Sequence, residues 1–189
     1  MRRLLRAARQ KVRAQSGFSL AETLVAMALL TIMSSAAALG VSQALKQRNH
    51  AIALADAQTV ASTAAQVITD QLRYGRIDPA HTGGDTAVLA SGTYGAPVCV
   101  TLDGNGYLTT GAASLSGGAV SQGTVHAMLS ADAYCGLRLA DLTFTAHTAG
   151  DTVKSVDVSF AVTSASSEDS LWNLEFSVAP INQRTFTLE

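Results

Sequence analysis

Three residues near the N-terminus have types and a spacing that can support chemistry: Gly17, Phe18 and Glu22. Glu22 is the only charged residue in the apolar stretch 18–41. A carboxylate gains nothing by entering a bilayer, so this acid must serve a purpose other than insertion. Phe18 and Glu22 are four residues apart and share one face of a helix. A carboxylate in the first turn of a helix is favoured by the helix dipole, and in apolar surroundings it strongly prefers a positive partner.

An arm with six basic residues and no acid precedes this group. The succession of a basic leader, Gly17, Phe18 and Glu22 resembles the type III signal of type IV prepilins and pseudopilins. The resemblance implies that a prepilin peptidase cuts after Gly17 and that Phe18 becomes the methylated first residue. It also implies that Glu22 pairs with the Phe18 amine of a neighbouring subunit during assembly. A carboxylate that snorkels to the lipid headgroups is the alternative explanation of Glu22.

The apolar stretch 18–41 is long enough to span a membrane. As a helix it measures about 36 Å, against about 30 Å for the hydrocarbon core. Basic residues that flank such a segment stay cytoplasmic, so its C-terminal side is expected to point outward. A secretory signal peptide is the alternative, because Ala36-Ala37-Ala38 is similar to its cleavage site. The length of the apolar run and the presence of Glu22 favour the prepilin interpretation.

The helix is expected to continue past the membrane, because no proline occurs before Pro79 and the residues after 41 are rich in Ala, Gln and Leu. We expect one helix from Phe18 to about Tyr74, with a weak point at Gly40. Its outer half carries an apolar stripe that either lies against the chain's own sheet or belongs to an ordinary core helix. The stripe consists of Ala53, Ala57, Val60, Ala64, Val67, Ile68 and Leu72.

The pattern changes from helical to alternating beyond residue 85, which predicts an antiparallel sheet. Strands are predicted at 156–162, 172–178 and 137–145, the last with a bulge near Ala140-Asp141, and a hairpin at 98–109. Further expectations are a short edge strand at 186–188 and loops at 81–85 and 111–123. The fold class is therefore α+β, with a long N-terminal helix whose second half packs on an antiparallel sheet, as in pilins.

Four segments follow from these expectations. They are a basic leader at 1–17, a membrane-spanning helix at 18–41, its extracytoplasmic continuation at 42–75, and a globular sheet domain at 76–189. Cys99 and Cys135 both fall in the last segment, outside the cytoplasm, where a disulfide persists. A bond between them is predicted and is worth about 4 kcal/mol on the chain-entropy model. Two unpaired buried thiols are the alternative.

Motifs of known enzymes do not occur in the sequence. The four histidines form no HExxH pattern, and neither a phosphate-binding loop nor a Gly-x-Ser-x-Gly elbow is present. The segment 103–106 resembles the start of an EF-hand loop but lacks the later ligands, so a hairpin turn is predicted. Asp151, Asp157, Glu168 and Asp169 do not have the spacing of a defined calcium site. We expect no enzymatic activity, no cofactor and no metal.

The predicted function is that of a structural subunit of a type IV pilus-like filament, and the 17-residue leader favours a minor pilin or pseudopilin. The expected partners are other such subunits, a prepilin peptidase, an assembly platform and the membrane before assembly. Beyond Gly17, seven basic residues face 14 acids, so the net charge does not indicate nucleic-acid binding. The chain is expected in the cytoplasmic membrane with its globular domain outside, and later in a filament. A monomeric membrane-tethered binding module is the alternative.

Overall fold

The computed structural model describes residues 19–90, 96–116, 119–164 and 170–188. The chain divides into two compact units, Met1–His50 and Ala51–Glu189. We call them the N-terminal unit and the sheet unit and describe each by itself.

Helix α2 (Leu20–Tyr74) contains 55 residues and belongs to both units. It ends at Tyr74 as predicted, where the Gly75 N–H donates to the Gln71 carbonyl. A Cβ at Gly75 would lie 2.7 Å from the Leu89 side chain, so a glycine lets the chain leave the helix close to the sheet. The expected weak point at Gly40 is not seen, because α2 is unbroken there. Residues 19–50 are all exposed.

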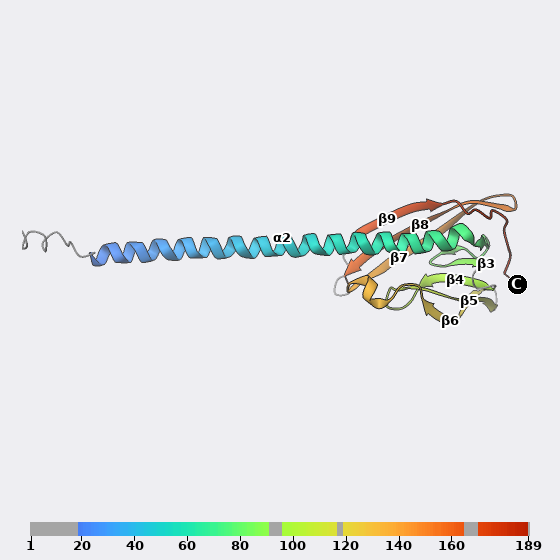
Figure 1. The fold of residues 1–189 in the computed structure, drawn as a ribbon, viewed down its shortest axis with the longest axis horizontal. Coiled ribbons are helices and arrows are strands. Elements are labelled where there is room, and N and C mark those ends of the chain that lie inside the picture. The colour runs from blue at the N-terminus through green and yellow to red at the C-terminus, as the bar shows by residue number, and fades with distance from the viewer. Residues whose placement is uncertain (1–18, 91–95, 117–118, 165–169, 189) are drawn as a thin grey trace, which may run out of the picture. The chain divides into compact units, whose positions relative to one another are not determined.

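The sheet unit contains two antiparallel sheets where the sequence predicted one (Figure 1). The first has the order β1-β3-β4-β5-β6 and the second the order β2-β7-β8-β9. We call them sheet A and sheet B. Sheet A consists of β1 (Arg76–Ile77), β3 (Ala87–Ala90), β4 (Pro97–Leu102), β5 (Leu108–Ser116) and β6 (Ala119–Ala127). Sheet B consists of β2 (Gly83–Gly84), β7 (Leu137–Ala149), β8 (Thr152–Ser164) and β9 (Ser170–Val178), and a 3-10 turn, η1 (Ala131–Tyr134), precedes β7.

The main core forms where the second half of α2 meets both sheets. The stripe predicted on the helix supplies five of its buried residues, Ala57, Val60, Ala64, Ile68 and Leu72, and Ala61 joins them. Sheet A contributes side chains such as Val98 and Leu108, and sheet B contributes side chains such as Phe144 and Val158. The α+β prediction is therefore confirmed, with the helix packed by its second half on antiparallel sheets.

Three predictions about the strands are confirmed. The alternating runs in β8 and β9 pair as expected, with Phe160 opposite Leu174 and Val158 opposite Phe176. The register of β7 on β8 shifts between Ala140 and Thr143, where Asp141 has a φ of 53°, so the predicted bulge is present. The predicted hairpin corresponds to β4 and β5, joined by a turn at residues 103–107.

Three other predictions are wrong. The small-residue segment 111–123 was expected to be a loop, but its described residues belong to β5 and β6. The 81–85 loop contains β2, which pairs with β7. Residues 186–188 do not form a strand. They belong to a C-terminal tail in which the Phe186 N–H donates to the Ile77 carbonyl and Leu188 packs on a second small core with Val88 and Cys99.

Candidate functional site

The start of helix α2 is organised around Ser19. The Glu22 N–H donates to the Ser19 carbonyl at 2.9 Å, and the Ser19 Oγ lies 3.2 Å from the same nitrogen. A serine side chain that accepts from a backbone N–H of the first turn is a helix N-cap. Glu22 is an acid in this first turn, where the positive end of the helix dipole favours it. Because Ser19 serves the backbone, the exposed Glu22 carboxylate remains available for a partner.

Hydroxyl groups along the apolar part of α2 bond to their own helix. Thr23 donates to the Leu20 carbonyl at 2.9 Å, Thr31 to Ala28 at 2.8 Å, and Ser35 donates to Ile32 at 2.8 Å. A hydroxyl in hydrocarbon otherwise lacks a partner, so these bonds reduce the cost of placing it there. Among the described residues, one helix, α2, is long and apolar enough to cross a membrane.

The apolar part of α2 has no cover within the N-terminal unit. Its large side chains are more than half exposed, for example Leu20 at 79% and Met33 at 71%. Such a continuous exposed apolar surface indicates contact with lipid or with other apolar helices. The surface therefore suits both a membrane and a bundle of like helices.

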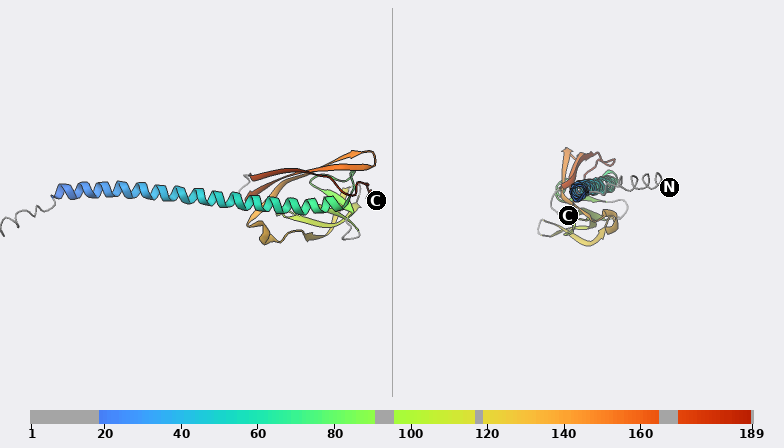
Figure 2. Two further views of the ribbon diagram at one scale, coloured as in Figure 1. Left: turned by 45° about the horizontal axis from the view of Figure 1, so that its top comes forward. Right: turned by 90° about the vertical axis from the view of Figure 1, so that its left-hand side faces the viewer.

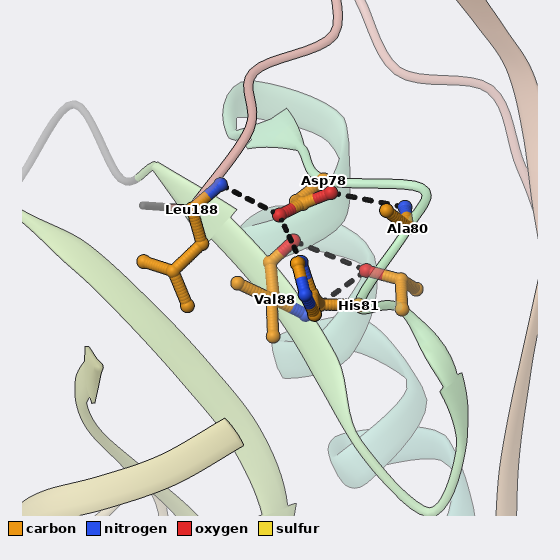
Figure 3. A network of polar contacts seen from close by, with 6 residues as sticks. Asp78, Ala80, His81, Val88 and Leu188 are labelled. Carbon is orange, nitrogen blue, oxygen red and sulfur yellow. Dashed lines mark hydrogen bonds and ion pairs between the residues drawn. The ribbon is translucent and has the colours of Figure 1, made fainter. Parts of the chain in front are cut away.

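A buried polar network joins the loop after α2 to the C-terminal tail (Figure 3). Asp78 is 0% exposed, and its carboxyl group accepts from the Ala80 N–H at 2.9 Å and from the Leu188 N–H at 2.8 Å. The His81 Nδ1 lies 2.7 Å from the same carboxyl group. Beside it, the Thr82 Oγ1 bonds both the N–H and the carbonyl of Val88. This network is structural, because the Asp78 and Thr82 side chains bond backbone groups of Ala80, Val88 and Leu188 and so hold these segments together.

The candidate calcium ligands that the structure describes do not form a metal-binding group. Asp103 is engaged by its own turn, since its Oδ1 accepts from the Asn105 N–H at 2.9 Å and from the Tyr107 N–H at 2.8 Å. The hairpin turn predicted there is therefore present. Glu168 and Asp169 lie outside the described residues. Among the residues that are described, no group of three His, Cys, Asp or Glu side chains is placed to hold a metal ion.

Asp157 faces solvent on sheet B and bonds to neighbours on both adjoining strands. The hydroxyl of Ser177 and the ring of His147 lower the pKa of the Asp157 carboxyl group. The His147 Nε2 lies 2.7 Å from its Oδ2. This pair is about half exposed, with 52% and 44% of the two side chains accessible, so it contributes little to stability.

Cys99 and Cys135 are both free thiols, and the structure does not confirm the predicted bond. Alternation along β4 turns Val98 and Val100 toward the main core and Cys99 toward the small core on the opposite face. Tyr134, next to Cys135, packs in the main core, while Cys135 itself is exposed. Cys99 is therefore buried in the small core, whereas Cys135 is exposed. Burial raises the pKa of the Cys99 thiol.

Gly17 and Phe18 lie outside the described residues, but comparison with known families covers them. The family model for the prokaryotic N-terminal methylation motif matches residues 12–38. This range includes the predicted cleavage position, the predicted methylated residue and Glu22. No curated protein and no solved structure matches the chain. The chain therefore carries the N-terminal signal of type IV pilins and pseudopilins, and this signal is typical of structural subunits.

Sequence reasoning missed two residues of this architecture. Ser19 directly precedes the apolar run that begins at Leu20, and a serine at this position is a common N-cap, so the sequence contained the signal for its role. No feature of the sequence around Asp78 predicts its role. Its link to Leu188 spans 110 residues, and no local pattern predicts a contact at that separation.

Proposed function

We propose that this chain is a minor pilin or pseudopilin, processed after Gly17 and assembled into a filament through its N-terminal helix. The match of the methylation motif to an uncovered apolar helix with one acid in its first turn supports this proposal most directly. The chain is inserted with its basic leader in the cytoplasm and the sheet unit outside. Other pilin or pseudopilin subunits, the peptidase and an assembly platform are its partners.

The Phe18 amine and the Glu22 carboxylate are the pair that sets the axial register of the filament. A subunit at the wrong height leaves both charges unmatched among apolar helices, and an unpaired charge in such surroundings is strongly unfavourable. Because the Ser19 Oγ accepts from the Glu22 backbone, the carboxylate is not needed to cap the helix. It is therefore free to bind the amine of a neighbouring copy.

Replacement of Glu22 tests the proposal. Glu22→Ala and Glu22→Gln are expected to insert into the membrane but to lose sedimentable filaments, because both remove the charge. Gln43→Ala, at another exposed position of α2, is the matched control and should assemble as wild type. Sequencing of the mature chain should give N-methylated Phe18 as its first residue.

Three results would count against the proposal. A mature chain that starts after Ala38 would make the segment a secretory signal peptide. Glu22→Ala filaments equal in amount to wild type would remove the role of the charge pair. A chain that is cut at Gly17 but stays monomeric in every condition would support a membrane-tethered binding module instead.

A further inference from the structure

Each sheet of the sheet unit ends in one long strand with a free edge. In sheet A this strand is β6, and in sheet B it is β9, and each contains nine residues. Neither pairs on its outer side with any residue that the structure describes. The two strands lie on opposite sides of the second half of α2 in all three views (Figures 1 and 2). The unit therefore presents two different open edges that face apart.

Neither edge carries the usual protection against pairing. Proteins block exposed edges with lysine, proline or inward-pointing charges. Strand β6 contains no Lys, Arg, Asp, Glu or Pro, and β9 contains one charged residue, Glu175. Val125 on β6 is 51% exposed. A long edge of this kind is a template for another strand.

The inner face of sheet A is hollowed next to β6. Thr110 and Ala112 follow Leu108 at alternate positions, so they point to the side of the main core. With Val98, Thr124 and His126 they line an apolar groove of about 230 Å³. Thr110 is only 5% exposed, and its Oγ1 has no hydrogen-bond partner among the described residues. A buried hydroxyl without a protein partner is rare, so the Thr110 hydroxyl can bond a donor that enters the groove.

The edge of sheet B carries the opposite feature, an apolar row with incomplete cover. Trp172, Leu174 and Phe176 pack on the main core yet remain half-buried, whereas Val158 and Val162 on the neighbouring β8 are fully buried. The partly buried Trp172 also carries an indole N–H donor, which usually finds an acceptor when a tryptophan becomes buried. The row of Trp172, Leu174 and Phe176 therefore offers an apolar surface and one hydrogen-bond donor, the indole N–H.

We propose that β9 of one copy adds to the free edge of β6 of the next, with Trp172 in the groove and its indole N–H donating to the Thr110 hydroxyl. An aromatic side chain on an added strand is long enough to reach over a small neighbour such as Thr124 toward the next strand. In this contact the unpaired backbone groups of the two edges form hydrogen bonds with each other, and the Thr110 hydroxyl gains a partner.

This contact joins two different surfaces, so it does not close on itself. A heterologous contact leaves one free edge at each end and propagates into an open polymer. The inference rests on the proposed filament function, because only a polymer brings β9 of each copy to β6 of the next. It adds a sheet-to-sheet contact to the assembly through the N-terminal helices.

Cross-linking of the full-length chain in membranes tests the pairing. Ser121→Cys on β6 and Glu175→Cys on β9 are combined in a Cys135→Ser background, which removes the exposed native thiol. A short bis-maleimide should then give a ladder of trimers and larger species, while each single-cysteine variant should give monomers. Filaments are sedimented from the same preparations as an independent measure of assembly.

The outcomes separate the inference from the proposed function. Sedimentable filaments without a ladder overturn the edge pairing and leave the filament function intact. Dimers from Ser121→Cys alone overturn it as well, because they mean that like edges pair. Absence of both filaments and ladder overturns both proposals.

A charge on the free edge gives a second test. Val125→Lys should abolish the ladder, while Ile181→Lys, which changes an apolar residue that is 68% exposed and outside both strands, should retain it. Trp172 is the only tryptophan, so its emission reports on the groove directly. Its emission maximum should shift to the blue on assembly of wild type and remain unshifted in Val125→Lys. A ladder in Val125→Lys equal to that of wild type contradicts the proposal.

Discussion

The backbone N–H of Leu188 donates to the carboxyl group of Asp78 at 2.8 Å, and this bond ties the end of the chain to the loop that follows α2. Around it, the Arg76 guanidinium donates to the Thr185 carbonyl, and the Phe186 N–H donates to the Ile77 carbonyl. The tail is therefore held along the first residues after the helix. Its last described residue covers the small core with Val88 and Cys99.

Removal of the Asp78 carboxyl group should destabilise the sheet unit. Asp78→Ala leaves the N–H groups of Ala80 and Leu188 without their acceptor, and we expect a loss of about 3 kcal/mol in the free energy of unfolding. Asp85→Ala is the control, because Asp85 is exposed and should cost less than about 0.5 kcal/mol. Denaturation of the full-length chain in detergent measures both. Equal stability of the two variants would contradict the role of Asp78.

The two cysteines should differ in reactivity toward an alkylating reagent. Cys135 is exposed and should react in the folded protein without reductant, whereas Cys99 is buried with a raised pKa and should react only after unfolding. Mass spectrometry of the native and denatured chain counts the modified thiols. A chain that takes up no reagent until it is reduced would show that the Cys99–Cys135 disulfide forms. Asp78→Ala should increase the labelling of Cys99, because the tail then releases its cover.

Substitution of two glycines in one turn should have very different effects. Gly106 has a φ of 78°, and a Cβ there would lie 2.5 Å from the Leu139 carbonyl oxygen. Gly106→Ala should therefore cost about 1–3 kcal/mol of stability. Gly104→Ala is the matched control, since a Cβ at Gly104 meets nothing within 4 Å. Comparison of the two unfolding midpoints checks the prediction, and a Gly106→Ala midpoint at or above that of Gly104→Ala would refute it.

Tyr134 should make the sheet unit sensitive to alkaline pH. Burial raises its pKa, and its hydroxyl oxygen accepts from the Leu108 N–H at 2.7 Å. Above about pH 10 the unfolded chain releases this proton while the folded chain keeps it, so stability falls as the pH rises. Tyr134→Phe should cost about 1–3 kcal/mol at neutral pH, because the Leu108 N–H loses its acceptor.

The pH dependence distinguishes this effect from simple loss of packing. The stability of Tyr134→Phe should decline less than that of wild type between about pH 9 and 11, since the shifted group is absent. Urea titrations at several pH values measure the difference. Parallel curves for the two proteins would show that the Tyr134 proton does not contribute.

Local periodicity was sufficient for much of the fold. The stripe on α2 and the alternation in β8 and β9 depend on neighbouring residues, and these elements formed with the expected faces buried. The segment 111–123 was predicted to be a loop because small residues are typical of loops. In the structure a small residue is needed at Gly111 because β6 lies close to it, and a Cβ there would be 2.8 Å from the Gln122 side chain. The division into two sheets depends on long-range pairings, such as β2 with β7, that no local pattern contains.

The candidate functional site also contains some features that the sequence predicts and others that depend on long-range contacts. Glu22 could be predicted because its charge conflicts with its apolar surroundings, and the family match places it within a known motif. The small core that buries Cys99 could not be predicted, because it forms from residues on four separate segments, with Leu188 the most distant. The disulfide was predicted only because both cysteines were expected outside the cytoplasm. That argument does not show toward which face of β4 the Cys99 side chain points.

The hydroxyls of Thr23, Thr31 and Ser35 have a further consequence for a subunit that changes its surroundings. Each already donates to a carbonyl of its own helix, so exchange of lipid for protein neighbours breaks and forms no hydrogen bond at these three positions. This part of α2 can therefore lie against lipid or against other apolar helices with the same hydrogen bonds at these three positions.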